Sequence, residues 1–261
     1  MFGALASLRS KAIPSRESLT IPKGSYRDWP VDEDADLFRE PLVEASEFGL
    51  SGRNYYAHDL NPPYWAPAPG AIDKLLMRES VARKLRGVDR RLREQGLCLH
   101  LYDAWRPRAV QAYFHNVWMP NELKRRWPDM SEADVKAGVG QYWAAPTVDP
   151  KRPAPHATGG AVDLTIAMID GPPLWMGSLF DDASPLAETD LFEPPHAQAF
   201  SFSHDEAMAN RRLLYWLMAD AGFSNFRNEW WHYSWGDQMW AQATGAPHAH
   251  YGLAAPPPGY E

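Results

Sequence analysis

The stretch PHATGGAVDLTI, residues 155–166, decides the fold. Its second half, 161–166, alternates in a way that predicts a β-strand, with its valine, leucine and isoleucine on the core-facing side. The opposite face then carries Asp163 in mid-strand. A carboxylate is unusual there, because burying a charge is costly unless it has a partner. The strand therefore indicates a specific partner for Asp163.

A candidate partner precedes the strand. Gly159 and Gly160 permit a tight turn with positive φ, and such a turn would fold His156 back beside Asp163. Imidazole and carboxylate groups are both good zinc ligands. We therefore expect His156 and Asp163 to be two of the ligands of a metal site.

The segments around this strand mix helices and strands without a regular β-α-β alternation. LCLHLYD, residues 97–103, predicts a second strand, and the aromatic run 230–235 predicts a third. Helices are expected in four places: after Ser80, after Pro107, from Ser131, and through 213–217. We therefore expect an α+β fold, a single domain with a central antiparallel sheet and flanking helices.

Composition limits the domain organisation and the partners. The 261 residues suit one large domain, 31–261, preceded by an N-terminal arm, 1–30. A net charge of −7 with scattered Lys and Arg argues against nucleic acid or an anionic membrane as the main partner. No window of about 18 apolar residues predicts a membrane span. No oligomeric state is indicated.

Cysteine content restricts the chemistry of any metal site. Cys98 is the single cysteine, which excludes an internal disulfide framework and a zinc site built on two thiolates. A metal would therefore be held by nitrogen and oxygen. The N-terminus lacks the pattern of a secretory signal, so the expected location is the cytoplasm, with the periplasm as the alternative.

A second segment, NEWWHY, supplies Glu229 and His232 three residues apart. On a regular strand these side chains would point to opposite faces of the sheet. They converge only if Glu229 lies in a bend or a helical turn. His232 is a third candidate ligand, with the core of an aromatic segment as the alternative place for it.

These residues together fill the roles of a metallohydrolase. Two histidines and Asp163 leave the fourth tetrahedral position of a zinc ion to water, which is typical of a catalytic site. Glu229 could take a proton from that water and return it to a leaving amine. Arg106, in YDAWRPR, could stabilise an oxyanion.

Each motif alone also suits a structural role. His156 would be an ordinary loop histidine, and Arg106 a surface residue at the start of a helix. The conjunction of the motifs favours metal-dependent hydrolysis. Neither H-E-x-x-H nor G-x-S-x-G occurs, so the commonest zinc-protease and serine-hydrolase motifs are absent.

The motifs YDAWRP, HATGGAVDLTI and EWWHY, in this order, resemble the zinc D-alanyl-D-alanine dipeptidases of peptidase family M15, the vancomycin-resistance type. The resemblance covers roughly residues 50–240. It implies a hedgehog/D-Ala-D-Ala-peptidase-like fold, one Zn²⁺ per chain and a small dipeptide substrate. The family's functional residues fall on the following positions: zinc ligands on His156, Asp163 and His232, the base on Glu229, and the transition-state arginine on Arg106.

The segment WMGSLFD resembles a family segment whose aspartate binds the amino group of the dipeptide. The resemblance implies this role for Asp181, with the adjacent Asp182 as the competitor. One departure from the family pattern is Ala154, which stands where the family has a serine. The missing hydroxyl bears on substrate preference and leaves the ligands unaffected.

Two rival functions remain beside dipeptide hydrolysis. One is a D,D-carboxypeptidase or endopeptidase that acts on peptidoglycan peptides with the same metal centre. The other is a non-catalytic, zinc-containing module that binds peptides, which would need neither Glu229 nor Arg106. Trp105, Trp230 and Trp231 adjoin the candidate residues in sequence and predict an aromatic-walled cavity.

Overall fold

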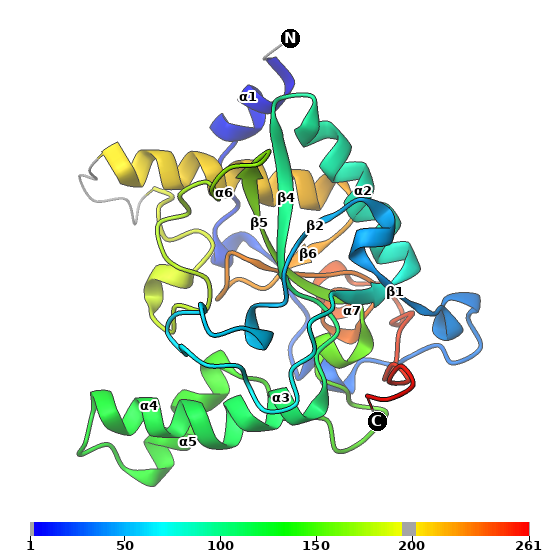
Figure 1. Cartoon of the computed structure of the whole chain (residues 1–261), viewed down its shortest axis with the longest axis vertical. Coiled ribbons are helices and arrows are strands. Elements are labelled where there is room, and N and C mark those ends of the chain that lie inside the picture. Colours follow the sequence, from blue (N-terminus) through cyan, green and yellow to red (C-terminus); the bar gives the residue numbers. More distant parts are fainter. Residues whose placement is uncertain (1–2, 195–201, 261) are drawn as a thin grey trace.

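Strand β5 is the middle strand of a five-stranded sheet with the order β2-β4-β5-β7-β6 (Figure 1). The computed structural model describes residues 3–194 and 202–260. The strands of this sheet are β2 (Ser51–Gly52), β4 (Leu97–Asp103), β5 (Ala161–Met168), β6 (Ser224–Asn225) and β7 (His232–Ser234). All neighbours are antiparallel except β2, which runs parallel to β4. The predicted α+β class is confirmed, and the parallel edge strand makes the sheet mixed.

The helices are α1 (Gly3–Ser10), α2 (Glu79–Arg93), α3 (Arg108–Tyr113), α4 (Met119–Arg126), α5 (Glu132–Tyr142), α6 (Phe202–Asp220) and α7 (Gln238–Thr244). The four predicted helices are present as α2, α3, α5 and α6, whereas α1, α4 and α7 were not predicted. A second, two-stranded sheet pairs β1 (Leu42–Glu44) with β3 (Leu76–Arg78). Within the described ranges, no helix combines the length and the apolar character that crossing a membrane requires.

The hydrophobic core lies between β4, β5 and the helices α2 and α6. The apolar face of α2 is fully buried and so is the core side of β5: Val81, Leu85, Val88, Leu92, Val162, Leu164 and Ile166. Each such side chain stabilises the fold by roughly 1.5–3 kcal/mol through removal from water. This packing fixes β5 at the centre of the molecule, so the polar side chain that β5 carries is held in a rigid frame.

The register of the sheet places charged and metal-ligating side chains in one row. Asp163 on β5 lies opposite His232 on β7 and, on its other side, opposite Asp103 on β4. The pairing of β4 with β5 shifts between Leu101 and Asp103. The third strand is shorter than the predicted run 230–235, because the residues before His232 form a turn.

The N-terminal arm, 1–30, lies along the body of the protein where it is described. Helix α1 packs against α6, and Arg9 donates a hydrogen bond of 2.8 Å to Asn210. Ile13 is buried, and its N–H donates to the Glu193 carboxylate at 3.0 Å. Figure 1 shows α1 at one end of the molecule and the α4–α5 hairpin at the other.

Candidate active site

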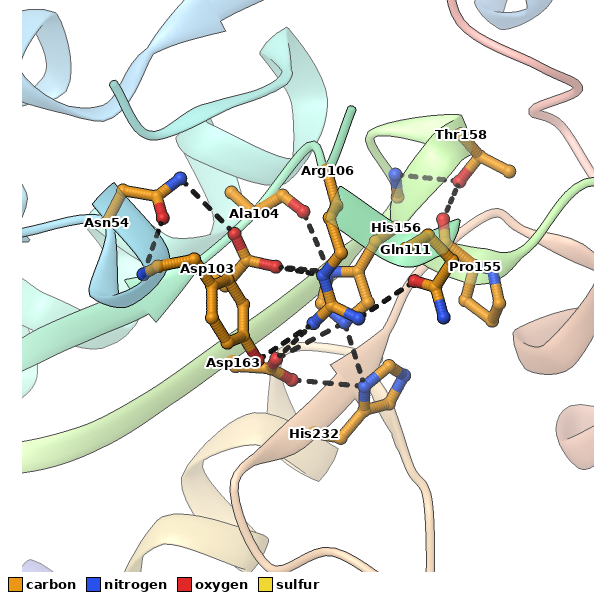
Figure 2. A network of polar contacts seen from close by, with 12 residues as sticks. Asn54, Asp103, Ala104, Arg106, Gln111, Pro155, His156, Thr158, Asp163 and His232 are labelled. Atoms are coloured by element: carbon orange, nitrogen blue, oxygen red, sulfur yellow. Dashed lines mark hydrogen bonds and ion pairs between the residues drawn. The ribbon is translucent and has the colours of Figure 1, made fainter. Parts of the chain in front are cut away.

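Three side chains expected to bind metal converge at the ends of β5 and β7. The Nε2 atom of His156 lies 3.2 Å from Nδ1 of His232 and 3.3 Å from the Asp163 carboxylate. His232 Nδ1 is 3.1 Å from the same carboxylate. One ligand atom from each residue lies within 4.8 Å of the others. Figure 2 shows the three groups pointing toward one another.

The glycine turn presents His156 as the sequence predicted. Residues Pro155–Thr158 form a short 3₁₀ helix, which Gly159 ends with a φ of 73°. The His156 Nδ1–H donates to the carbonyl oxygen of Ala104 at 2.7 Å, which directs Nε2 at Asp163. The hydrogen bond thus orients the ring so that Nε2 faces the other candidate ligands.

Glu229 lies in a turn, which is the condition for its side chain to converge with that of His232. The His232 N–H donates to the Glu229 carbonyl oxygen at 3.3 Å, so the segment between the two residues is a turn rather than a strand. The Glu229 carboxylate lies 3.9 Å from His232 Nδ1. Burial, followed by the negative charges of Asp163 and Asp181, raises the pKa of Glu229 well above its ordinary value.

Arg106 joins two carboxylates that the sheet places side by side. Its Nε donates to Asp103 at 2.8 Å and its Nη2 to Asp163 at 3.2 Å. Gln111 and Tyr56 accept two further hydrogen bonds from it, at 2.9 and 3.3 Å. Burial raises the pKa of Asp103 despite the opposing charge of Arg106. Two adjacent buried carboxylates would repel each other, and the guanidinium offsets this repulsion.

Burial also acts on Asp163, but there the neighbouring groups dominate. Desolvation alone would raise its pKa, whereas the charges and hydrogen bonds of His156 and His232 hold the pKa of Asp163 below its usual range. Asp163 is therefore held as a carboxylate, which is the form that binds a metal.

Asp181 lies in the same cavity and is held by two tyrosines. The hydroxyls of Tyr56 and Tyr64 donate to its carboxylate at 2.7 and 2.8 Å. Burial and the negative charge of Asp163 raise the pKa of Asp181 to about 7. The described lining of the cavity includes Asp181 and not its competitor Asp182.

The cavity has a volume of about 290 Å³ and contains all six residues that the sequence singled out as site residues. Its aromatic lining comes from Tyr26, Tyr142, Trp143 and Phe226. The tryptophans predicted to form this wall are instead in the protein interior, because their rings pack against core residues. Ala154 is buried and is not part of the described lining.

The donor set fits a zinc ion. Two imidazole nitrogens and a carboxylate oxygen are typical ligands of a catalytic zinc, and no thiolate is needed. His156, Asp163 and His232 are all buried, and the His156 ring is oriented by a backbone carbonyl, which is the usual support for a metal-binding histidine.

Several residues around the site were not predicted from the sequence. Asp103 is the last residue of the predicted strand 97–103. Its position three residues before Arg106 in the sequence could have indicated that the two side chains pair. Tyr56 and Tyr64 come from irregular segments with no periodic pattern, and only the folded chain brings them to Asp181.

Two histidines and an aspartate around one point, with a glutamate in the same cavity, are the groups that the site of a mononuclear metallohydrolase requires. A family model described as D-Ala-D-Ala dipeptidase matches residues 70–250. The chain belongs to the D-Ala-D-Ala dipeptidase family, which confirms the resemblance and the peptidase class that it implied.

Two relatives illustrate the level of similarity. A D-alanyl-D-alanine dipeptidase of Synechocystis sp. is 33% identical over 150 residues, covering 54% of this chain and 60% of the relative. One from Enterococcus faecalis is 28% identical over 167 residues, covering 62% of this chain and 74% of the relative. The chain thus spans somewhat over half the length of the Synechocystis relative.

Solved structures are more distant. VanYB in complex with D-alanine-D-alanine has 15% identity and a TM-score of 0.39, covering 67% of this chain and 81% of that one. A zinc complex of a vancomycin-resistance D,D-pentapeptidase VanY variant has 15% identity and a TM-score of 0.38, covering 67% and 83%.

Proposed function

We propose that the protein is a zinc-dependent dipeptidase that hydrolyses D-Ala-D-Ala or a similar small dipeptide. The observation that carries the proposal is the convergence of His156, Asp163 and His232 in one cavity with Glu229. The family match and the relatives named as D-alanyl-D-alanine dipeptidases support the substrate class. We further propose a cytoplasmic location.

His156, Asp163 and His232 would hold the metal. Zinc, when bound there, polarises the scissile carbonyl and lowers the pKa of water. Glu229 accepts the proton of the attacking water on its carboxylate and donates it to the nitrogen of the leaving amine. Its hydrogen-bonded turn next to His232 keeps the carboxylate beside the ligands during this transfer.

Arg106 supplies positive charge where the scissile carbonyl gains negative charge. Its hydrogen bonds to Asp103, Asp163 and Gln111 fix the guanidinium before substrate arrives, so little reorganisation is needed in the transition state. The same hydrogen bonds hold the positive charge of the Arg106 guanidinium inside the cavity.

Asp181 would bind the free amino group of the substrate. Both tyrosine hydrogen bonds go to Oδ2, so Oδ1 has no hydrogen-bond partner among residues 3–194 and 202–260, and the residue lines the cavity. A carboxylate that pairs with a free ammonium group favours short substrates over N-acylated chains. The cavity of about 290 Å³ is also suited to a small ligand.

One assay separates this function from its closest rival. Release of free D-alanine is measured from D-Ala-D-Ala, from an N-acylated D-Ala-D-Ala peptide and from an L,L-dipeptide, each with and without a chelator. We expect chelator-sensitive cleavage of the free D,D-dipeptide. Cleavage of the acylated peptide alone would indicate a D,D-carboxypeptidase, and no cleavage with full zinc binding would favour a binding module.

A further inference from the structure

Two residues of the N-terminal arm reach the active-site cavity. Tyr26 and Arg27 lie in a short 3₁₀ helix, Tyr26–Asp28, and both line the cavity that contains the candidate zinc ligands. This segment precedes residue 70, where the family match begins. The cavity therefore has a wall that the family motifs do not supply.

Arg27 is held in place by backbone groups of other segments. Its Nη2 donates to the Ala145 carbonyl oxygen at 2.5 Å, its Nη1 to that of Arg152 at 3.1 Å, and its Nε to the Tyr26 hydroxyl at 3.1 Å. Gln238 on α7 donates in turn to the Arg27 carbonyl oxygen at 3.2 Å. These contacts fix the guanidinium at the edge of the cavity instead of leaving it to move in solvent.

The two arginines that line the cavity, Arg27 and Arg106, differ in their charged partners. Arg106 is already paired with two carboxylates, Asp103 and Asp163. Arg27, in contrast, forms no ion pair within 4.0 Å among residues 3–194 and 202–260. The neighbouring Asp28 pairs with Arg152 instead. A guanidinium has five N–H donors, so Arg27 retains donors beyond the three hydrogen bonds described.

A free dipeptide at neutral pH carries a carboxylate at the end opposite its ammonium group. That carboxylate needs a cation or several donors when it leaves water. We propose that Arg27 binds the C-terminal carboxylate of the substrate and thereby selects for dipeptides with a free C-terminus. This inference rests on the proposed dipeptidase function.

The test compares D-Ala-D-Ala with its C-terminal amide, which lacks the carboxylate. In Arg27→Gln, KM for the free dipeptide should rise about 10- to 100-fold, the effect of losing a hydrogen bond to a charged group. The kinetic constants for the amide should change less than threefold. Arg152→Gln is the matched control, because it breaks the ion pair with Asp28 in the same 3₁₀ helix but removes no side chain from the cavity lining.

Other outcomes overturn the inference. An equal loss on both substrates would show that Arg27 only supports the wall, and unchanged KM for the free dipeptide would show that the carboxylate binds elsewhere. If the wild-type protein cleaves neither substrate, the proposed function fails. Calorimetric binding of D-Ala-D-Ala and its amide to the zinc-loaded wild type and Arg27→Gln then decides the role of Arg27 independently, and equal affinities would reject it.

Discussion

Glu229 and His232 face each other across a single turn: the His232 N–H bonds to the Glu229 carbonyl oxygen, and the Glu229 carboxylate lies 3.9 Å from His232 Nδ1. The proposed metal ligand and the proposed base are therefore placed by the same four residues, 229–232. Any change that opens this turn should disturb metal binding and proton transfer together.

Removing only the Glu229 carboxylate should abolish proton transfer without affecting metal binding. In Glu229→Gln the shape of the turn is retained, so zinc content should equal that of the wild type. The rate should fall about 100-fold or more, because a general base is lost. Zinc is measured by atomic absorption, and kcat by D-alanine release. Activity near the wild-type level would remove Glu229 from the mechanism.

His156→Ala should abolish stoichiometric zinc binding. The substitution deletes one of three protein ligands, and its Nε2 lies 3.2 and 3.3 Å from the other two. His115→Ala serves as control, since His115 lines the cavity but lies outside the ligand cluster. Equal zinc content in the wild type and His156→Ala, after dialysis against a weak chelator, would contradict the assignment.

Arg106→Lys should lower both activity and stability. A lysine ammonium cannot span the positions of Nε and Nη2, so one of the buried carboxylates of Asp103 and Asp163 loses its ion pair. Breaking a buried pair typically costs about 3–5 kcal/mol, and the lost oxyanion partner about 100-fold in kcat.

The matched control for that variant is Arg108→Lys. Arg108 is an exposed arginine two residues further on that donates to the Thr147 carbonyl oxygen. Urea unfolding and kcat are measured for both variants. Equal, small effects of the two substitutions would show that Arg106 has no special place in the site.

The pKa of Asp181 predicts a pH dependence of stability in the metal-free protein. Burial and Asp163 raise this pKa from 3.8 to about 7, opposed by the hydrogen bonds of Tyr56 and Tyr64 and by the charge of Arg106. The folded state therefore binds the proton more tightly than the unfolded state. Its stabilising contribution is complete below about pH 4 and is lost as the pH rises toward 7.

In Asp181→Asn this loss should disappear, so the difference in unfolding free energy between pH 5 and pH 7.5 should be smaller than in the wild type. Asp182→Asn, which changes the neighbouring carboxylate outside the cavity lining, should keep the wild-type slope. Denaturant unfolding of the metal-free protein at both pH values measures this difference in unfolding free energy. Identical slopes for the wild type and Asp181→Asn would refute a raised pKa.

The candidate metal ligands and the candidate base were easier to predict from the sequence than the residues that surround them. His156 and Asp163 were paired correctly because a glycine turn and an alternating strand act over a few residues. Glu229 needed a turn that the sequence permitted but did not specify. Tyr56, Tyr64 and Asp103 were missed, because their contacts depend on packing between segments distant in sequence.

The position of Tyr26 and Arg27 in the cavity has a consequence for how selectivity can change. The ligands, Glu229 and Arg106 all lie within residues 70–250, whereas this wall lies outside them. If Arg27 binds the substrate as proposed, one determinant of substrate choice lies outside the stretch that carries the reaction, whereas Asp181 lies inside it. Exchanging the arm for that of another family member is a route to new substrate preference that leaves the bond-breaking groups untouched.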